Sequence, residues 1–190
     1  MPLVSRRDLD DEGAFVVSRK PRPPTIRQYR HRDDAEIWAL ASLPDVTPPG
    51  VALPPIPLPG ADRPPPECPD LADISDRFLR SGGDFLVAEI DGDIVGTAGL
   101  LLADDKVADV VRVRVHPAVR RRGVGTALLE AVEWRAEGLG VRRLNLDVGE
   151  NQRDVIAFYL ASGFRKLDAD DESEQQWDLS LFSKALRVLP

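Results

Sequence analysis

A short stretch of arginines and glycines stands where a strand pattern gives way to a helix pattern. Arg120–Arg122 come first, and Gly123 and Gly125 follow. The first turn of a helix carries unpaired N–H groups and the positive end of the helix dipole, so it stabilises an anion. Glycines let a bulky phosphate approach the main chain, and the arginines add positive charge. The stretch predicts a site for a phosphorylated ligand; two glycines that only ease a turn are the open alternative.

Two common nucleotide-binding motifs do not fit this stretch. The dinucleotide fingerprint needs a third glycine, and a P-loop needs Gly-Lys-Ser/Thr, and neither is present here. The phosphorylated ligand therefore belongs to another class.

Composition excludes several classes of function. The net charge of −7 argues against a nucleic-acid partner, which would require a basic face. Cys68 is the only cysteine, so neither an internal disulfide nor a cysteine-rich metal site is expected. No apolar run suits a membrane span or a signal peptide. We expect a cytoplasmic protein without a metal and without a nucleic-acid or membrane partner, and a homodimer is one assembly it could form.

Apolar periodicity predicts the elements that must position this site. Strands are expected at 25–30, 85–90, 94–102, 109–116, 143–148 and 176–182, and helices at 33–42, 71–80, 123–137 and 154–161. A further short β segment is expected to begin at 163–164. This order predicts an α/β (α+β) fold with a single mixed, mostly antiparallel sheet of six to seven strands, flanked by about four helices.

The composition also suggests how the chain is divided. Residues 1–24 are expected to be a flexible N-terminal tail, and residues 25–190 a single domain. Eleven of the 17 prolines fall in residues 44–69, where neither a helix nor a strand can continue. Because this insertion is also apolar, we expect it to lie against the protein surface instead of extending away from it into solvent.

The sequence resembles the GNAT superfamily of acetyl-CoA-dependent N-acetyltransferases, whose cofactor motif is Arg/Gln-x-x-Gly-x-Gly/Ala. Arg120, Gly123 and Gly125 match that motif. The resemblance extends from Thr25 to about Phe182 and includes the strand end Val113-x-Val115-x-Pro117, the Asn151 region and Tyr159-x-x-x-Gly163-Phe164.

The resemblance implies how acetyl-CoA would bind as a co-substrate. The sheet would splay between strands 109–116 and 143–148, and the pantetheine arm would insert in the gap. The implied cofactor-binding residues are Val113, Val115, Arg120, Arg121, Arg122, Gly123, Val124, Gly125, Thr126, Asn151 and Tyr159. Asn151 departs from the family, because it precedes Tyr159 by eight residues instead of seven and Gln152 takes the usual place.

Three residues are candidates for proton transfer. The resemblance implies that Tyr159 protonates the departing thiolate, as a phenol can by donating a hydrogen bond; packing alone is the alternative. Asp109 is the candidate base, because relatives often place a carboxylate on this strand, although it could simply end a turn in solvent. Glu89, inside an apolar strand, is the reserve base, since a half-buried carboxylate tends toward a raised pKa.

Arg112 and Arg114 are the candidate substrate-binding residues. They alternate with Val111, Val113 and Val115 on the strand beside the expected thioester. If that face opens onto the acceptor cleft, the amine also carries an acid group; if it is covered, the arginines pair with local acids such as Glu89. The acidic loop 168–174 favours a cationic amine instead.

These features together predict an N-acetyltransferase that moves the acetyl group of acetyl-CoA to a primary amine by direct attack. A small-molecule acceptor is favoured over a protein tail. The alternative is a non-catalytic acetyl-CoA-binding sensor or structural module of the same fold.

Overall fold

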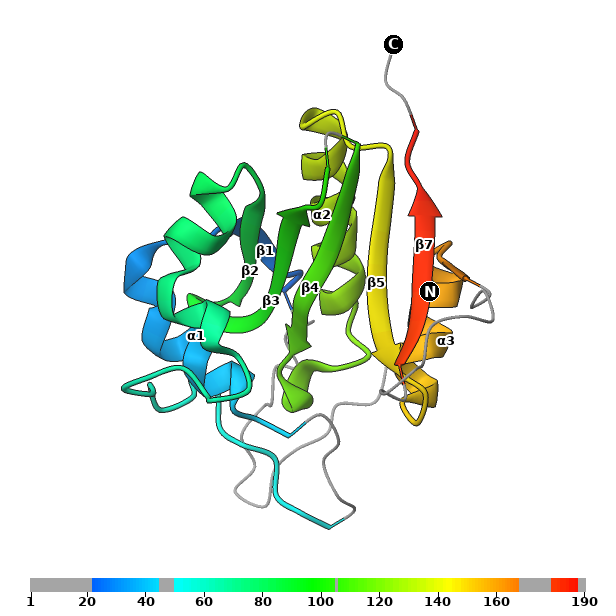
Figure 1. Cartoon of the computed structure of the whole chain (residues 1–190). Coiled ribbons are helices and arrows are strands. Elements are labelled where there is room, and N and C mark those ends of the chain that lie inside the picture. Colours follow the sequence, from blue (N-terminus) through cyan, green and yellow to red (C-terminus); the bar gives the residue numbers. More distant parts are fainter. Residues whose placement is uncertain (1–21, 45–49, 105, 168–178, 188–190) are drawn as a thin grey trace, which may run out of the picture.

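A computed structural model of the chain describes residues 22–44, 50–104, 106–167 and 179–187. Seven strands form one sheet in the order β1-β2-β3-β4-β5-β7-β6 (Figure 1). Their bounds are Thr25–Gln28 (β1), Asp84–Ile90 (β2), Asp93–Leu102 (β3), Val107–Val115 (β4), Arg143–Gly149 (β5), Arg165–Lys166 (β6) and Leu179–Ala185 (β7). Only β4 and β5 pair in parallel, so the mixed, mostly antiparallel sheet expected from the sequence is confirmed.

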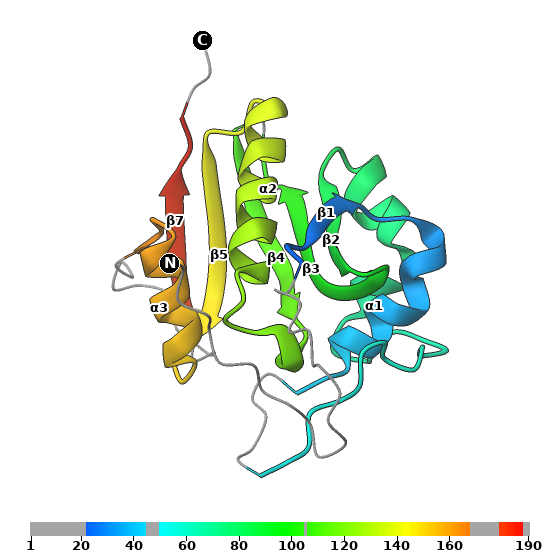
Figure 2. The same ribbon diagram turned by 180° about the vertical axis from the view of Figure 1, so that it is seen from behind.

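Helical segments cover both faces of the sheet. One face carries the turn η1 (His31–Asp33), helix α1 (Asp34–Ala41) and two short helices, η2 (Pro69–Asp73) and η3 (Ser75–Arg80). The other face carries α2 (Val124–Gly138) and α3 (Arg153–Ala161), with the turn η4 (Pro117–Val119) leading into α2. Figures 1 and 2 show α1 and the two short helices on one face of the sheet and α2 and α3 on the other. Helix α2 packs mainly on β3, with β2 and β4 beside it, whereas α3 lies nearer the β7 edge.

Each face of the sheet has its own apolar core. The larger one packs α2 and α3 against the sheet through residues such as Leu128, Val132 and Leu144. The smaller one packs α1, η2 and η3 through Ile37 and Phe78. Within the described part of the chain, no helix combines the length and the hydrophobicity that crossing a bilayer would require.

A β-bulge interrupts strand β4 in the middle of its Val/Arg alternation. Gly99 pairs with Val111, but Thr97 pairs with Arg114, so β4 contains one extra residue between these pairs. Arg112 adopts a left-handed backbone with φ of 55°, and its carbonyl accepts a hydrogen bond of 2.9 Å from Thr97 Oγ1. The bulge places Val111 in the smaller core, while Val113 and Val115 pack against the larger one. The strict alternation expected for these valines is therefore wrong.

Strands β4 and β5 pair only at their first residues. The register joins Val107–Asp109 to residues 143–145 and ends there. Beyond Asp109, the β5-facing edge of β4 has no strand partner among the described residues, so the two strands part. This is the splay that the resemblance implied between strands 109–116 and 143–148.

Two predicted elements differ in detail. The helix expected at 71–80 is a 3₁₀ turn followed by a π-helical turn, because apolar spacing alone does not distinguish between helix types. The described part of the last strand is Leu179–Ala185, which ends three residues beyond the expected end at 182. Its C-terminal end is set by pairing with β5 and by Lys184, whose Nζ donates to Glu133 Oε1 on α2 at 2.6 Å. The Gln176–Trp177 end of the expected strand lies outside the described residues, as does the acidic loop 168–174.

Candidate functional site

The N-terminus of α2 lies beside the gap where β4 and β5 no longer pair. Gly123 caps the helix with a left-handed backbone, φ 83°, and Arg121 has φ of 63°. A side chain is disfavoured at Gly123 by this conformation, although a Cβ there would meet no atom within 4 Å. The first N–H groups of the helix, those of Val124, Gly125 and Thr126, have no acceptor within α2. A phosphate at this first turn would satisfy these donors.

Gly125 lies closer than Gly123 to the side chains that border the gap between β4 and β5. A Cβ added there would lie 3.5 Å from the Phe158 ring and 3.7 Å from Val115 Cγ2, which are ordinary contact distances. One methyl group therefore fits, whereas a larger side chain would enter the space between β4 and α3. This agrees with the Gly/Ala choice in the family motif.

The three arginines of the motif differ in exposure. Arg120 is half-buried, and its Nε donates to Val115 O at 3.2 Å, which ties the turn to the end of β4. Arg121 and Arg122 are exposed beside the first turn of α2. They can add positive charge next to a bound phosphate.

Tyr159 lies on α3, in the larger core. Its residue surface is 6% exposed, and its ring packs between Phe158 and Phe164, with centroid separations of 5.2 and 5.6 Å. No hydrogen bond to its hydroxyl is present within the described part of the chain. Burial raises the pKa of the phenol well above its ordinary value, and the charge of Asp147 raises it further. The hydroxyl therefore stays protonated at neutral pH and can donate a hydrogen bond.

Asp109 occupies the last position at which β4 and β5 still pair, opposite Asn145. It is half-buried, so burial raises the pKa of its carboxyl, and the negative charge of Asp147 adds to that shift. The Asn145 Oδ1 atom is buried without a hydrogen-bond partner in the described structure. A buried acceptor of this kind is costly unless a ligand's N–H group reaches it.

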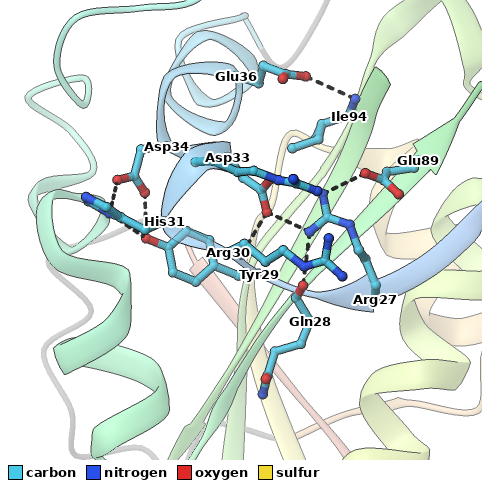
Figure 3. A network of polar contacts seen from close by, with 11 residues as sticks. Arg27, Gln28, Tyr29, Arg30, His31, Asp33, Asp34, Glu36, Glu89 and Ile94 are labelled. Carbon is cyan, nitrogen blue, oxygen red and sulfur yellow. Dashed lines mark hydrogen bonds and ion pairs between the residues drawn. The ribbon is translucent and has the colours of Figure 1, made fainter. Parts of the chain in front are cut away.

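Glu89, the reserve base, belongs to a polar network at the other side of the sheet (Figure 3). Arg27 Nη2 donates to Glu89 Oε1 at 2.6 Å, and the same guanidinium forms two hydrogen bonds with the buried Asp33, at 2.6 and 3.0 Å. Strand β3 separates this network from β4. The arginine neutralises Glu89, and the network fixes the start of α1 to β1 and β2.

Arg112 and Arg114 face the side of the sheet that η2 and the proline-rich insertion cover. Arg112 forms two hydrogen bonds with Asp70 of η2, at 2.9 and 2.7 Å, and a third to Cys68 Sγ at 3.1 Å. Burial lowers the pKa of its guanidinium, but Asp70 outweighs that effect and the pKa is raised. Arg112 is therefore covered and paired with a local acid, which is Asp70 instead of the expected Glu89.

Arg114 instead borders a cavity of about 480 Å³. The end of α1 and the proline-rich insertion form the rest of its lining: Ala41, Ser42, Leu43, Pro44, Arg63, Pro64, Pro65, Pro66, Glu67 and Cys68. His116, which is fully buried, fastens the insertion to the end of β4 through its Nε2 atom, 3.2 Å from Pro55 O. Burial lowers the pKa of His116, so the ring stays neutral there. Residues 50–68 of the insertion are thus joined to the end of β4 and form one wall of this cleft.

The structure also places the two candidates for the start of α3. Gln152 is the N-cap residue and is half-buried, whereas Asn151 stands just before it and is exposed. Gly149 approaches both closely: a Cβ there would lie 3.1 Å from Asn151 Oδ1 and 3.7 Å from Gln152 Cγ. Both side chains therefore lie near the end of β5, and a contact of Asn151 with the cofactor stays a prediction.

Two residues at the gap were missed from the sequence. Asn145 and Asp147 alternate along β5 with the buried Leu144, Leu146 and Val148. That polar and apolar alternation is visible in the sequence and indicates a face directed away from the larger core. Asp70, the partner of Arg112, carries no such signal.

Comparisons with known proteins agree with this geometry. The profile of the Acetyltransferase (GNAT) family matches residues 54–164, more than half of the chain. N-acetyltransferase 8 of Rattus norvegicus is 34% identical over 103 residues, which cover 51% of this chain and 46% of that protein. The chain thus spans about half the length of the curated relatives it matches.

Solved structures share the fold at low identity. An acetyltransferase of the GNAT family from Staphylococcus aureus superposes with a TM-score of 0.69 at 20% identity, over 87% of this chain and 100% of that one. A GNAT family acetyltransferase from Elizabethkingia anophelis with acetyl-CoA bound gives a TM-score of 0.50 at 22% identity, over 60% and 82% of the two chains. The chain belongs to the GNAT acetyltransferase family.

Proposed function

We propose that this protein transfers the acetyl group of acetyl-CoA to a primary amine by direct attack of the amine on the thioester. The observation that carries the proposal is the parting of β4 from β5 directly beside the first turn of α2. A phosphate-binding helix terminus and a free strand edge are what a phosphorylated, amide-containing arm requires. The test is amine-dependent release of free thiol from acetyl-CoA.

The cofactor would be held mainly by backbone groups. The pyrophosphate fits the N–H groups of Val124, Gly125 and Thr126, with Arg121 and Arg122 nearby. The pantetheine amides fit the free edge of β4 at Val113 and Val115, beyond the last pair with β5. The orphaned Asn145 Oδ1 supports a ligand in this gap, because a cofactor or acceptor N–H would satisfy it.

Tyr159 is the proposed acid. As the amine adds to the carbonyl and the C–S bond breaks, the sulfur gains negative charge, which a nearby phenol stabilises by donating its proton. The absence of a hydrogen-bond partner for this hydroxyl among the described residues supports the role. A carboxylate at the gap takes the proton that the amine loses, and Asp109 is the candidate from the sequence.

The acceptor would enter through the cavity of about 480 Å³ beside Arg114. Its size and its proline-rich wall support a small-molecule amine over a protein tail. A reducing, cytoplasmic location accords with the buried free thiol of Cys68. Quaternary structure stays a prediction from the sequence.

Arg114→Ala tests which amine the cavity accepts. If Arg114 binds an acid group on the acceptor, the substitution raises KM roughly tenfold or more for acid-bearing amines, because a charge-assisted hydrogen bond is worth about 1.5–3 kcal/mol. KM for simple polyamines should change little. Steady-state assays with the two sets of amines make the comparison. An equal effect on both sets would contradict a role for Arg114 in acceptor choice.

A further inference from the structure

A second carboxylate faces the gap from the opposite strand. Asp147 lies on β5, two residues beyond Asn145, the last β5 residue paired with β4. Its neighbours Leu146 and Val148 are buried in the larger core, so Asp147 points to the other face of the sheet. Asp109 shares that face, because Ala108 and Val110 are in the larger core. The two carboxylates therefore lie on one face, where the strands part.

The surroundings of Asp147 leave its charge available. Asp147 is exposed, and within the described part of the chain it has neither an ion pair nor a hydrogen bond. Its partner on β7 is Leu181, which is 56% exposed, and Leu179 follows on the same face. The cation across the gap, Arg112, is bound by Asp70. Glu89, Asp33 and Asp84, by contrast, all have arginine partners.

Asp147 also acts electrostatically on both proposed proton-transfer groups. Burial is the larger cause of the raised pKa of both Asp109 and Tyr159, and the negative charge of Asp147 is the second cause. Asp109 is on β4 and Tyr159 is on α3, so the charge of Asp147 on β5 acts on groups of two different elements. Asp109 lies at the closed end, where the strands still pair, whereas Asp147 lies where they have separated.

We infer that Asp147 is the catalytic base that takes the proton of the acceptor amine, a role that rests on the proposed acetyl transfer. An exposed carboxylate at the open part of the gap can meet the incoming ammonium and pass its proton to water. Asp109 is half-buried and lies at the closed end, where β4 and β5 still pair.

The ammonium loses one proton to Asp147, and the free amine adds to the thioester carbonyl to form a C–N bond. The tetrahedral adduct passes a second proton from nitrogen to water as the C–S bond breaks, and the thiolate receives a proton from Tyr159, which is reprotonated by solvent. The products are the amide, free thiol of coenzyme A and one proton released to water.

The test compares Asp147→Asn, Asp147→Glu and Asp109→Asn. With acetyl-CoA saturating, Asp147→Asn should lower kcat/KM for the amine by about 10²–10⁴ at neutral pH, the usual range for a general base. The deficit should shrink as pH approaches the amine's own pKa, because the amine then arrives deprotonated. Asp147→Glu should recover much of the rate, and Asp109→Asn should lose much less. Acetyl-CoA affinity and the unfolding midpoint should stay near wild type in all three.

Three results would overturn the inference. The first is a near wild-type rate in Asp147→Asn, and the second is a loss that follows Asp109→Asn instead. The third is a deficit that is constant across pH, which would make Asp147 a positioning residue. Failure of the proposed function itself is distinguishable, because then the wild-type protein releases no thiol with any amine.

Discussion

Tyr159→Phe should lower kcat by about 10²–10⁴ while the Kd for acetyl-CoA stays near the wild-type value. The lost hydroxyl matters only as the thiolate forms, so its removal affects the transition state more than cofactor binding. In free energy this corresponds to about 2.7–5.5 kcal/mol of transition-state stabilisation. The measurement is steady-state thiol release at saturating acetyl-CoA, together with a direct binding titration.

The structure makes this substitution a clean one. Phe keeps the ring that packs against Phe158 and Phe164, and the hydroxyl has no hydrogen-bond partner to lose among the described residues. The free energy of unfolding should therefore change little. A variant with wild-type turnover would mean that Tyr159 is only a packing residue and that water or another group protonates the thiolate.

Gly125→Val should abolish the stabilisation that acetyl-CoA gives the folded protein. For the wild type that stabilisation is about 2.7 kcal/mol at a hundredfold excess over Kd, and it is measured as a shift in Tm. A Cβ at Gly125 already contacts Phe158 and Val115, so the further methyl groups of valine enter the space between α2, β4 and α3. The valine side chain would then occupy the space proposed for the pyrophosphate and the adjoining part of the pantetheine arm.

Two controls separate this loss from a general defect. Gly125→Ala should keep most of the shift, because the added methyl group makes only contacts of 3.5 Å or longer. Gly138→Val makes the same change at the far end of α2, where a Cβ meets nothing within 4 Å, and should keep the shift in full. Gly123 is a poorer test, because its φ of 83° makes any side chain destabilise the fold by itself. An undiminished shift in Gly125→Val would contradict the pyrophosphate site.

Features encoded over a few neighbouring residues could be predicted from the sequence. The helix after Gly123 follows from its apolar spacing, and the phosphate site follows from glycines at a helix start. The single mixed sheet followed from the order of the predicted elements, but its splay came from the family resemblance, because no local pattern states which strands pair. The bulge at Arg112 was not predictable: alternating valines and arginines look the same with or without one extra residue.

Ion pairs between residues far apart in the sequence could not be predicted either. Arg112 pairs with Asp70, 42 residues earlier, and Arg27 with Glu89, 62 residues later. Neither pairing has a local signal in the sequence. Glu89 was therefore a candidate base, although Arg27 neutralises its charge in the structure. Asp147 was overlooked for a different reason, since a polar residue alternating with leucines is also typical of an ordinary solvated strand face.

Acetyl transfer itself is tested most directly by incubating the wild-type protein with acetyl-CoA and a panel of primary amines. Free thiol and acetylated amine are measured together, the latter by mass spectrometry, against a blank without amine. We expect thiol release that depends on the amine, with one acetylated amine formed for each thiol. Stabilisation by acetyl-CoA without any amine-dependent thiol release would contradict catalysis and identify the protein as an acetyl-CoA-binding module.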